Sequence, residues 1–182
     1  MLPSKRIRPI KSDIKWLEKA VEGHYLIRDG VDYVNNNNRY DKAHNLLSES
    51  YKLAKNNASE YDLARICLWN GISMNENLTI PHIRRNKIAI ELYKKGLEHI
   101  KRSNESDDKI LPIKSSLYNS LGVANHHLVV DKIPKISYYY YKKSRDIFRN
   151  NPQLYKKLIR IMNKVEYNTG HRIMRGGGGN YI

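Results

Sequence analysis

Residues 43–50 read AHNLLSES, residues 89–96 read AIELYKKG and residues 137–144 read SYYYYKKS, and the expected fold follows from these three stretches. Each begins and ends with a small residue, carries two large residues at its fourth and fifth positions, and is followed five residues later by a lysine or an arginine. They recur at intervals of 46 and 48 residues. Small residues seven positions apart lie on one face of a helix and allow a neighbouring helix to approach closely. We therefore predict that Ala89 and Gly96 are contact points between helices.

The rest of the chain also has the pattern of successive helices. No run of alternating β-branched residues is bounded by hairpin turns, so strands are not expected. Asn35 to Asn38 compete with a helix for backbone hydrogen bonds and predict a loop, as does the polar segment 103–108. Pro134 and Pro152 suit the first turn of a helix. We predict seven helices, over about residues 12–34, 39–55, 59–74, 84–101, 111–129, 134–149 and 152–167.

The repeated stretches resemble the second helix of the tetratricopeptide (TPR) repeat, and Gly30, Gly71 and Gly122 supply part of the pattern of its first helix. The resemblance covers about residues 22–150. It implies an all-α superhelix of about three TPR-like helix pairs, with residues 152–167 as a C-terminal capping helix. The repeat length departs from that of the family, which is about 34 residues. An ordinary helical bundle whose small residues coincide by chance is the alternative.

The same pattern predicts one helical domain, residues 12–168, between two tails. The N-terminal tail, residues 1–11, is basic. The C-terminal tail, residues 169–182, contains four consecutive glycines, which disfavour a helix and predict a flexible segment.

The chain carries 33 Lys and Arg against 18 Asp and Glu, a formal net charge of +15 at pH 7, and the excess lies at its ends. Residues 21–131 have a net charge of +1, whereas residues 132–182 carry +10. Such a cationic segment attracts nucleic acid or an acidic protein. Because Asn, Ile, Lys and Tyr make up 73 of the 182 residues, the codon usage of an AT-rich genome is the alternative explanation. The predicted basic surface comprises Lys142, Lys143, Arg145, Arg149, Lys156, Lys157 and Arg160.

Four consecutive tyrosines lie within the last of the repeated stretches. On a helix they point around most of its circumference. Tyr140 and Tyr141 occupy the core positions of the repeat, whereas Tyr138 and Tyr139 are expected to be more exposed. Packing is the expected role of the four rings, and stacking on the bases of a single strand is the alternative.

No motif in the sequence indicates catalysis or cofactor binding. HExxH, a Walker loop, GxGxxG and GxSxG do not occur. The adjacent His126 and His127 diverge by about 100° on a helix, so they do not form a usual metal-binding pair. Cys67 lies among apolar residues and is expected to be a buried thiol. We therefore expect no enzyme, no cofactor and no metal site.

The sequence also bears on where the protein acts. No run approaches the about 18 apolar residues of a membrane helix, so we expect no membrane partner. The N-terminus lacks the apolar core of a secretory signal. We therefore expect an intracellular, cytoplasmic protein, with a nuclear or virion-associated protein as the alternative.

The resemblance implies a non-catalytic scaffold that binds a peptide or a partner protein in a concave groove, which the first helix of each pair lines. Flanking positive charge would favour an acidic peptide. The alternatives are a nucleic-acid-binding protein that uses the basic C-terminal third, and a structural component of a viral particle or ribonucleoprotein from an AT-rich genome. The resemblance places the following residues on the groove: Ser116, Asn119, Val123 and His126.

Overall fold

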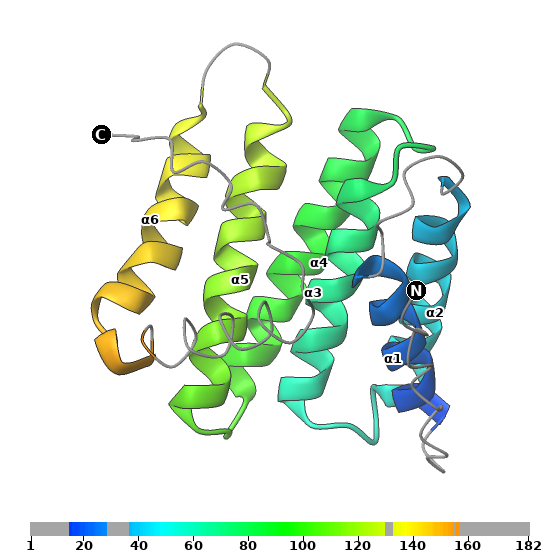
Figure 1. The fold of residues 1–182 in the computed structure, drawn as a ribbon, viewed down its shortest axis with the longest axis horizontal. Helices are drawn as coiled ribbons and strands as arrows, with labels where there is room; N and C mark the ends of the chain where they lie inside the picture. The colour runs from blue at the N-terminus through cyan, green and yellow to red at the C-terminus, as the bar shows by residue number, and fades with distance from the viewer. Residues whose placement is uncertain (1–14, 29–36, 130–132, 155, 157–182) are drawn as a thin grey trace, which may run out of the picture. The chain divides into compact units, whose positions relative to one another are not determined.

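The computed structural model describes residues 15–28, 37–129, 133–154 and 156, and all regular structure in this part of the chain is helical (Figure 1). The predicted all-α fold is confirmed. Residues 152–154 and 156 are helical and begin the seventh predicted helix, whose remainder lies outside the described residues. The labelled helices are α1 (Lys15–Arg28), α2 (Asn37–Ala54), α3 (Glu60–Glu76), α4 (His82–Arg102), α5 (Asp107–His126) and α6 (Lys135–Arg149).

The loop predicted at residues 103–108 is shorter in the structure. α5 begins at Asp107 rather than near Leu111, and Pro112 lies inside its second turn. The reason is electrostatic: Ser106 is followed by two aspartates, whose negative charge is favourable at the positive end of the helix dipole.

The run of four asparagines is not entirely a loop either. α2 begins at Asn37, so the last two asparagines belong to its first turn. Backbone N–H groups in a first turn have no partner within the helix, which lowers the cost of a residue that competes for hydrogen bonds. α1 ends at Arg28, and residues 29–36 lie outside the described part of the chain.

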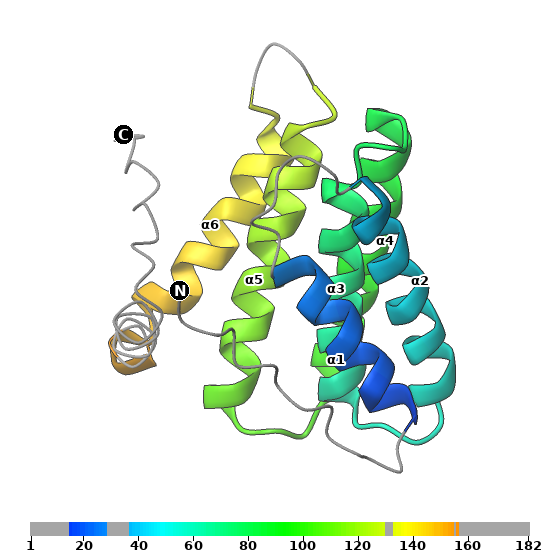
Figure 2. The same ribbon diagram turned by 45° about the vertical axis from the view of Figure 1, so that its right-hand side comes forward.

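The chain falls into two compact units, residues 1–144 and residues 145–182. In the first unit, α1 packs on α2, α2 on α3, α3 on α4 and α4 on α5. Contacts also join α1 to α3 and α3 to α5, so these three alternate helices form one row (Figure 2). The first part of α6 packs on α5, where the hydroxyl oxygens of Ser115 and Ser144 are 2.8 Å apart.

Two hydrophobic clusters fill the space between these helices. The partly buried ring of Trp69 packs against both, so the core is continuous from α1 to α5. The cluster between α1, α2 and α3 consists of Ala20, Leu47, Ala54, Leu63 and Ile66. The cluster between α3, α4 and α5 consists of Ala64, Leu68, Met74, Ala89, Ile90, Tyr93, Leu97, Ile100, Leu117, Leu121 and Ala124.

Both small columns of the repeated stretches are buried. Ala43, Ala89 and Ser137 are each 0% exposed, and the second column, Ser50, Gly96 and Ser144, is also buried. A Cβ atom on Gly96 would lie 2.8 Å from Cδ2 of Leu117 on α5 and 3.3 Å from Cβ of Cys67 on α3. The predicted contact at Gly96 is therefore confirmed, and so is the burial of Cys67.

A glycine on the first helix of each pair faces a large side chain on the second. Gly71 of α3 faces the Tyr93 ring of α4, and Gly122 of α5 faces the Tyr141 ring of α6. A Cβ atom on either glycine would lie less than 3.0 Å from that ring. In the first pair, the glycine that meets Leu47 is Gly23. Gly30, which the sequence pattern assigned to this role, lies outside the described residues.

Candidate functional site

The four predicted groove residues lie on one side of α5. The other sides of this helix are occupied, since Leu117 and Leu121 are in the core and Gly122 faces α6. The stripe comprises Ser116 and Asn119, which are exposed, and Val123 and His126, which are half-buried.

Two polar side chains of this stripe differ in their capacity to form further hydrogen bonds. Ser116 Oγ donates to the carbonyl oxygen of Pro112 at 3.0 Å, so its proton is already used within the helix. The amide of exposed Asn119 makes no hydrogen bond within the described residues. An amide both donates and accepts, so Asn119 is suited to pair with the backbone of an extended peptide.

α3 and α1 continue the row of α5 with half-buried apolar and aromatic side chains. Val123 of α5 corresponds to Ile72 of α3 and to His24 of α1, because each directly follows the glycine that contacts the next helix. The His24 ring stacks on Trp69, with ring centroids 4.2 Å apart, and so joins α1 to α3. The guanidinium carbon of Arg65 lies 4.8 Å from the centre of the Trp69 ring. The row therefore combines apolar surface with flat rings that neighbouring side chains hold in place.

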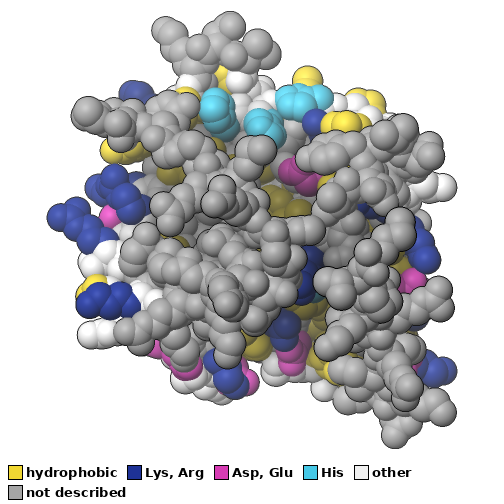
Figure 3. Space-filling model, in the orientation of Figure 1, with side chains coloured by type: hydrophobic (Ala, Val, Ile, Leu, Met, Phe, Trp, Pro, Cys, Tyr) yellow, Lys and Arg dark blue, Asp and Glu magenta, His cyan; other side chains and the backbone are white. Residues whose placement is uncertain are grey.

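Three imidazoles meet where α4 begins and α5 ends. The ring centroids of His82 and His127 are 6.0 Å apart, and those of His126 and His127 are 6.3 Å apart. Figure 3 shows histidine side chains gathered at one edge of the face that it displays. The sequence did not predict that His82 joins His126, because the two lie 44 positions apart and no local pattern connects them.

The surroundings of His127 disfavour the charged form of its imidazole. Partial burial lowers the pKa of His127, and repulsion from His82, His126 and Arg85 lowers it further. Among the groups that affect this pKa, only Glu76 raises it. A bound carboxylate would offset this repulsion and favour the charged imidazole. The cluster therefore suits a negatively charged ligand.

Two buried polar atoms near the facing ends of α3 and α4 have no partner within the described residues. They are Nε of Arg85 and Oδ1 of Asn75. Nη1 of Arg85 donates to the carbonyl oxygen of Asn77 at 3.1 Å. The hydrogen-bonding capacity of this guanidinium is therefore only partly satisfied. The residues that the structure describes contain no group of three or more His, Cys, Asp and Glu side chains arranged for a metal ion.

A second polar cluster lies between α2, α3 and α4, with the buried His99 at its centre. His99 is 4% exposed, and its Nε2 lies 2.7 Å from the hydroxyl oxygen of Tyr51. Its Nδ1 lies 2.6 Å from Oε2 of Glu60, to which Nε of Arg102 also donates at 3.1 Å. The hydrogen bond from His99 is the largest cause of the lowered pKa of Glu60. Every member of this cluster is paired with another, so its role is to hold three helices together.

Cys67 does not add a nucleophile to that cluster. Burial raises the pKa of its thiol to about 12. The thiolate is the reactive form of cysteine, so Cys67 is protonated and unreactive at neutral pH.

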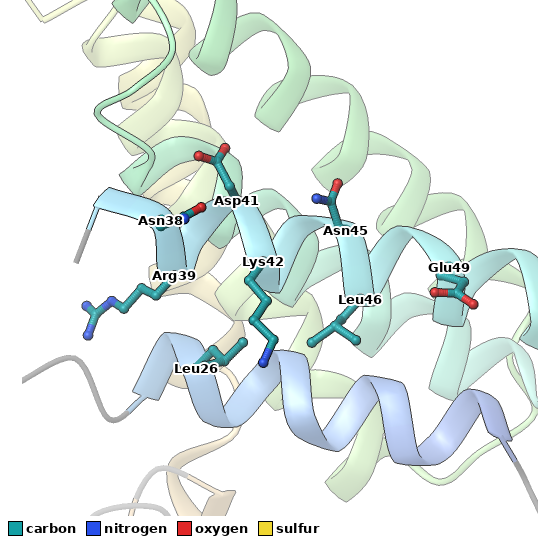
Figure 4. Close-up of a pocket in the computed structure, with 8 residues that line it drawn as sticks. All are labelled: Leu26, Asn38, Arg39, Asp41, Lys42, Asn45, Leu46 and Glu49. Carbon is teal, nitrogen blue, oxygen red and sulfur yellow. The ribbon is translucent and has the colours of Figure 1, made fainter. Parts of the chain in front are cut away.

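A shallow pocket of about 510 Å³ lies between α1 and α2 (Figure 4). Its charged groups already have partners: Lys42 pairs with Glu22 at 3.1 Å, and Asp41 accepts from Nδ2 of Asn77 at 2.6 Å. A site lined mainly by paired charges offers little to a ligand. None of the predicted site residues lies here. The lining residues are Leu26, Asn38, Arg39, Asp41, Lys42, Asn45, Leu46 and Glu49.

The predicted basic surface is described only in part. Lys142 and Lys143 are exposed on α6 and belong to the first compact unit. Arg145, Arg149 and Lys156 are exposed in the second unit. Lys157 and Arg160 lie outside the described residues. The single surface formed by all seven therefore stays a prediction.

Comparison of the chain with protein-family models, with curated proteins and with solved structures found no match. Among the helices that the structure describes, none has the length and apolar character to cross a membrane.

Proposed function

We propose that the chain is a non-catalytic, TPR-like scaffold that binds an extended acidic peptide, or such a segment of a partner protein, along the row of α1, α3 and α5. The observation that carries the proposal is the contact of α3 with both α1 and α5. Neither of these helices is next to α3 in the sequence. In a stack of helix pairs, such contacts arise when the first helices of successive pairs line one face. The predicted residues of α5 belong to that row.

The internal repetition supports the same proposal. Gly23 meets Leu47, Gly71 meets Tyr93 and Gly122 meets Tyr141. The same contact between the two helices of a pair thus recurs at nearly equal spacing along the chain, as expected of stacked repeats.

The chemistry of the row fits an extended, acidic segment. Trp69, Ile72 and Val123 offer half-buried apolar surface, and the amide of Asn119 offers backbone hydrogen bonds. At the end of α5, Arg85 offers a positive charge and the neighbouring imidazoles offer N–H groups, both of which suit an acidic side chain or a terminal carboxylate.

A displayed library of random peptides, selected on the full chain, tests the proposal. We expect the enriched peptides to be acidic. The double variant Asn119→Ala/His126→Ala should weaken binding of a synthetic peptide from that selection by about tenfold, since two hydrogen bonds are lost. Fluorescence anisotropy measures the affinity. The matched control is Lys87→Ala/Glu91→Ala, two exposed changes on α4.

The control variant should bind as the parent does, and circular dichroism should show that both variants are folded. The proposal fails if no peptide is enriched, or if the Asn119 and His126 changes leave the affinity unaltered.

A further inference from the structure

The described part of α6 has two unlike faces. The inner face carries the buried Ser137 and Ser144 and the half-buried rings of Tyr140 and Tyr141. Tyr141 lies against Gly122, and the rings of Tyr118 and Tyr140 stack with centroids 6.3 Å apart. The outer face carries only exposed residues over the same turns. They are Lys135, Ile136, Tyr138, Tyr139, Lys142 and Lys143.

The two tyrosines on the outer face are unusually exposed for aromatic residues. Tyr138 is 63% exposed and Tyr139 is 50% exposed. The Tyr139 ring is held in place, because Tyr140 meets it edge-on at 5.3 Å and Nζ of Lys143 lies 5.5 Å from its centre. An exposed ring with a cation beside it is suited to stack on a base while the cation meets a phosphate.

Three lysines supply the positive charge of this face. Lys135, Lys142 and Lys143 form no ion pair with any described residue. Within the part of the chain that the structure describes, no carboxylate neutralises their charge. Elsewhere in the described residues, some lysines are paired with glutamate, as Lys19 is with Glu49 and Lys42 with Glu22, whereas exposed Lys52 and Lys87 form no ion pair either.

We propose that the outer face of α6, residues 135–143, binds single-stranded nucleic acid, with Tyr138 and Tyr139 stacking on bases and Lys135, Lys142 and Lys143 meeting phosphates. The exposed rings favour a single strand over a duplex, because a ring can stack only on bases that are not already stacked on each other. They also favour nucleic acid over an acidic protein, since unpaired lysines alone would suffice for carboxylates. This site is separate from the row of α1, α3 and α5.

The test measures binding of the full chain to a fluorescein-labelled 15-nucleotide oligo(dT), to a duplex of equal length and to a polyglutamate peptide. The single strand should bind most tightly. Its log affinity should fall linearly with log salt, by about 0.7 for each phosphate contacted. Tyr138→Ala/Tyr139→Ala should weaken binding of the single strand by about tenfold or more and leave the salt dependence unchanged. Tyr138→Phe/Tyr139→Phe should retain the affinity, because stacking uses the ring and not the hydroxyl.

The lysines are tested with a control of equal charge. Lys142→Glu/Lys143→Glu should weaken binding at least tenfold and reduce the salt slope. Lys52→Glu/Lys87→Glu makes the same change of net charge at exposed positions on α2 and α4, and should cost far less.

Three results would overturn the proposal. The first is equal weakening by the two pairs of lysine changes, which would mean that only net charge matters. The second is unaltered affinity of Tyr138→Ala/Tyr139→Ala, which would mean that no base stacks there. The third is polyglutamate or the duplex binding as tightly as the single strand. Circular dichroism confirms that each variant is folded, and the peptide assay of the preceding section is unaffected by any of these outcomes.

Discussion

Because glycine has no Cβ atom, α3 and α4 can approach each other closely at Gly71. The three atoms nearest to a Cβ placed there all belong to the ring of Tyr93, which is 1% exposed and has no room to move aside. At Gly96 the nearest atom is instead the end of the Leu117 side chain, which has more freedom to rotate. The two glycines therefore look alike in sequence but differ in what an added methyl group would meet.

We predict that Gly71→Ala destabilises the protein by about 1–3 kcal/mol because it overpacks the core, although alanine is the better helix former. Gly96→Ala should cost less, and Gly96→Leu should again cost about 1–3 kcal/mol. Urea unfolding followed by circular dichroism measures these differences, with the exposed Glu91→Ala as the control. A more stable Gly71→Ala variant would contradict the close contact with Tyr93.

One buried imidazole makes contacts with two neighbouring helices. His99 of α4 contacts Tyr51 of α2 and Glu60, the first residue of α3. Since Glu60 also receives a hydrogen bond from Arg102, its carboxylate is favoured over the protonated acid and its pKa is lowered from 4.5. The charge of Glu60 thus contributes to the contact between α3 and α4.

The pH dependence of stability tests this arrangement. A carboxyl group whose pKa is lower in the folded state stabilises the fold above its unfolded pKa, and this contribution is lost as the pH falls through the folded pKa. The parent protein should therefore lose stability below about pH 4.5. In Glu60→Gln this acid-dependent loss should be smaller, and the stability at pH 7 should be lower. Melting temperatures between pH 7 and pH 3 measure both effects.

Glu91→Gln, at an exposed position on α4, serves as the control for the Glu60 change. Equal acid sensitivity of the parent and Glu60→Gln would show that the contact between His99 and Glu60 does not contribute to stability.

In the first compact unit, each helix packs mainly on its neighbours in sequence. The cluster around Leu47 involves α1, α2 and α3, and the cluster around Leu117 involves α3, α4 and α5. In a repeat array of the kind proposed here, stability is approximately a sum over repeats and the interfaces between neighbouring repeats. A defect at the first pair should therefore have a more local effect than one in the middle.

We predict that Leu47→Ala loosens α1 and α2 while α4 and α5 remain protected, whereas Leu117→Ala reduces protection throughout α3, α4 and α5. Both side chains are 0% exposed, so each change should cost about 2–5 kcal/mol. Hydrogen exchange, followed by mass spectrometry of peptides, measures the protection of each helix. Uniform loss of protection in both variants would indicate one cooperative bundle instead of a repeat array.

The elements themselves could be predicted from the sequence because helix formation depends on side chains a few positions apart. The spacing of small and large residues placed α3, α4 and α6 to within two residues at each end, and it identified Gly96 as a helix contact. The burial of Cys67 followed from its apolar neighbours in the same helix. Local reasoning failed where α2 and α5 begin, because Asn37 and Asp107 lie in segments that were predicted to be loops.

The candidate site required the tertiary structure because its parts come from different helices. His82 and His127 are far apart in sequence, and they meet only because α4 begins where α5 ends. Likewise, the sequence contains 20 lysines but does not tell which of them face a glutamate across a helix interface. The stacking of His24 on Trp69 depends on the contact of α1 with α3. Periodicity along the chain determined the helices, and the packing of one helix on another decided which side chains share a surface.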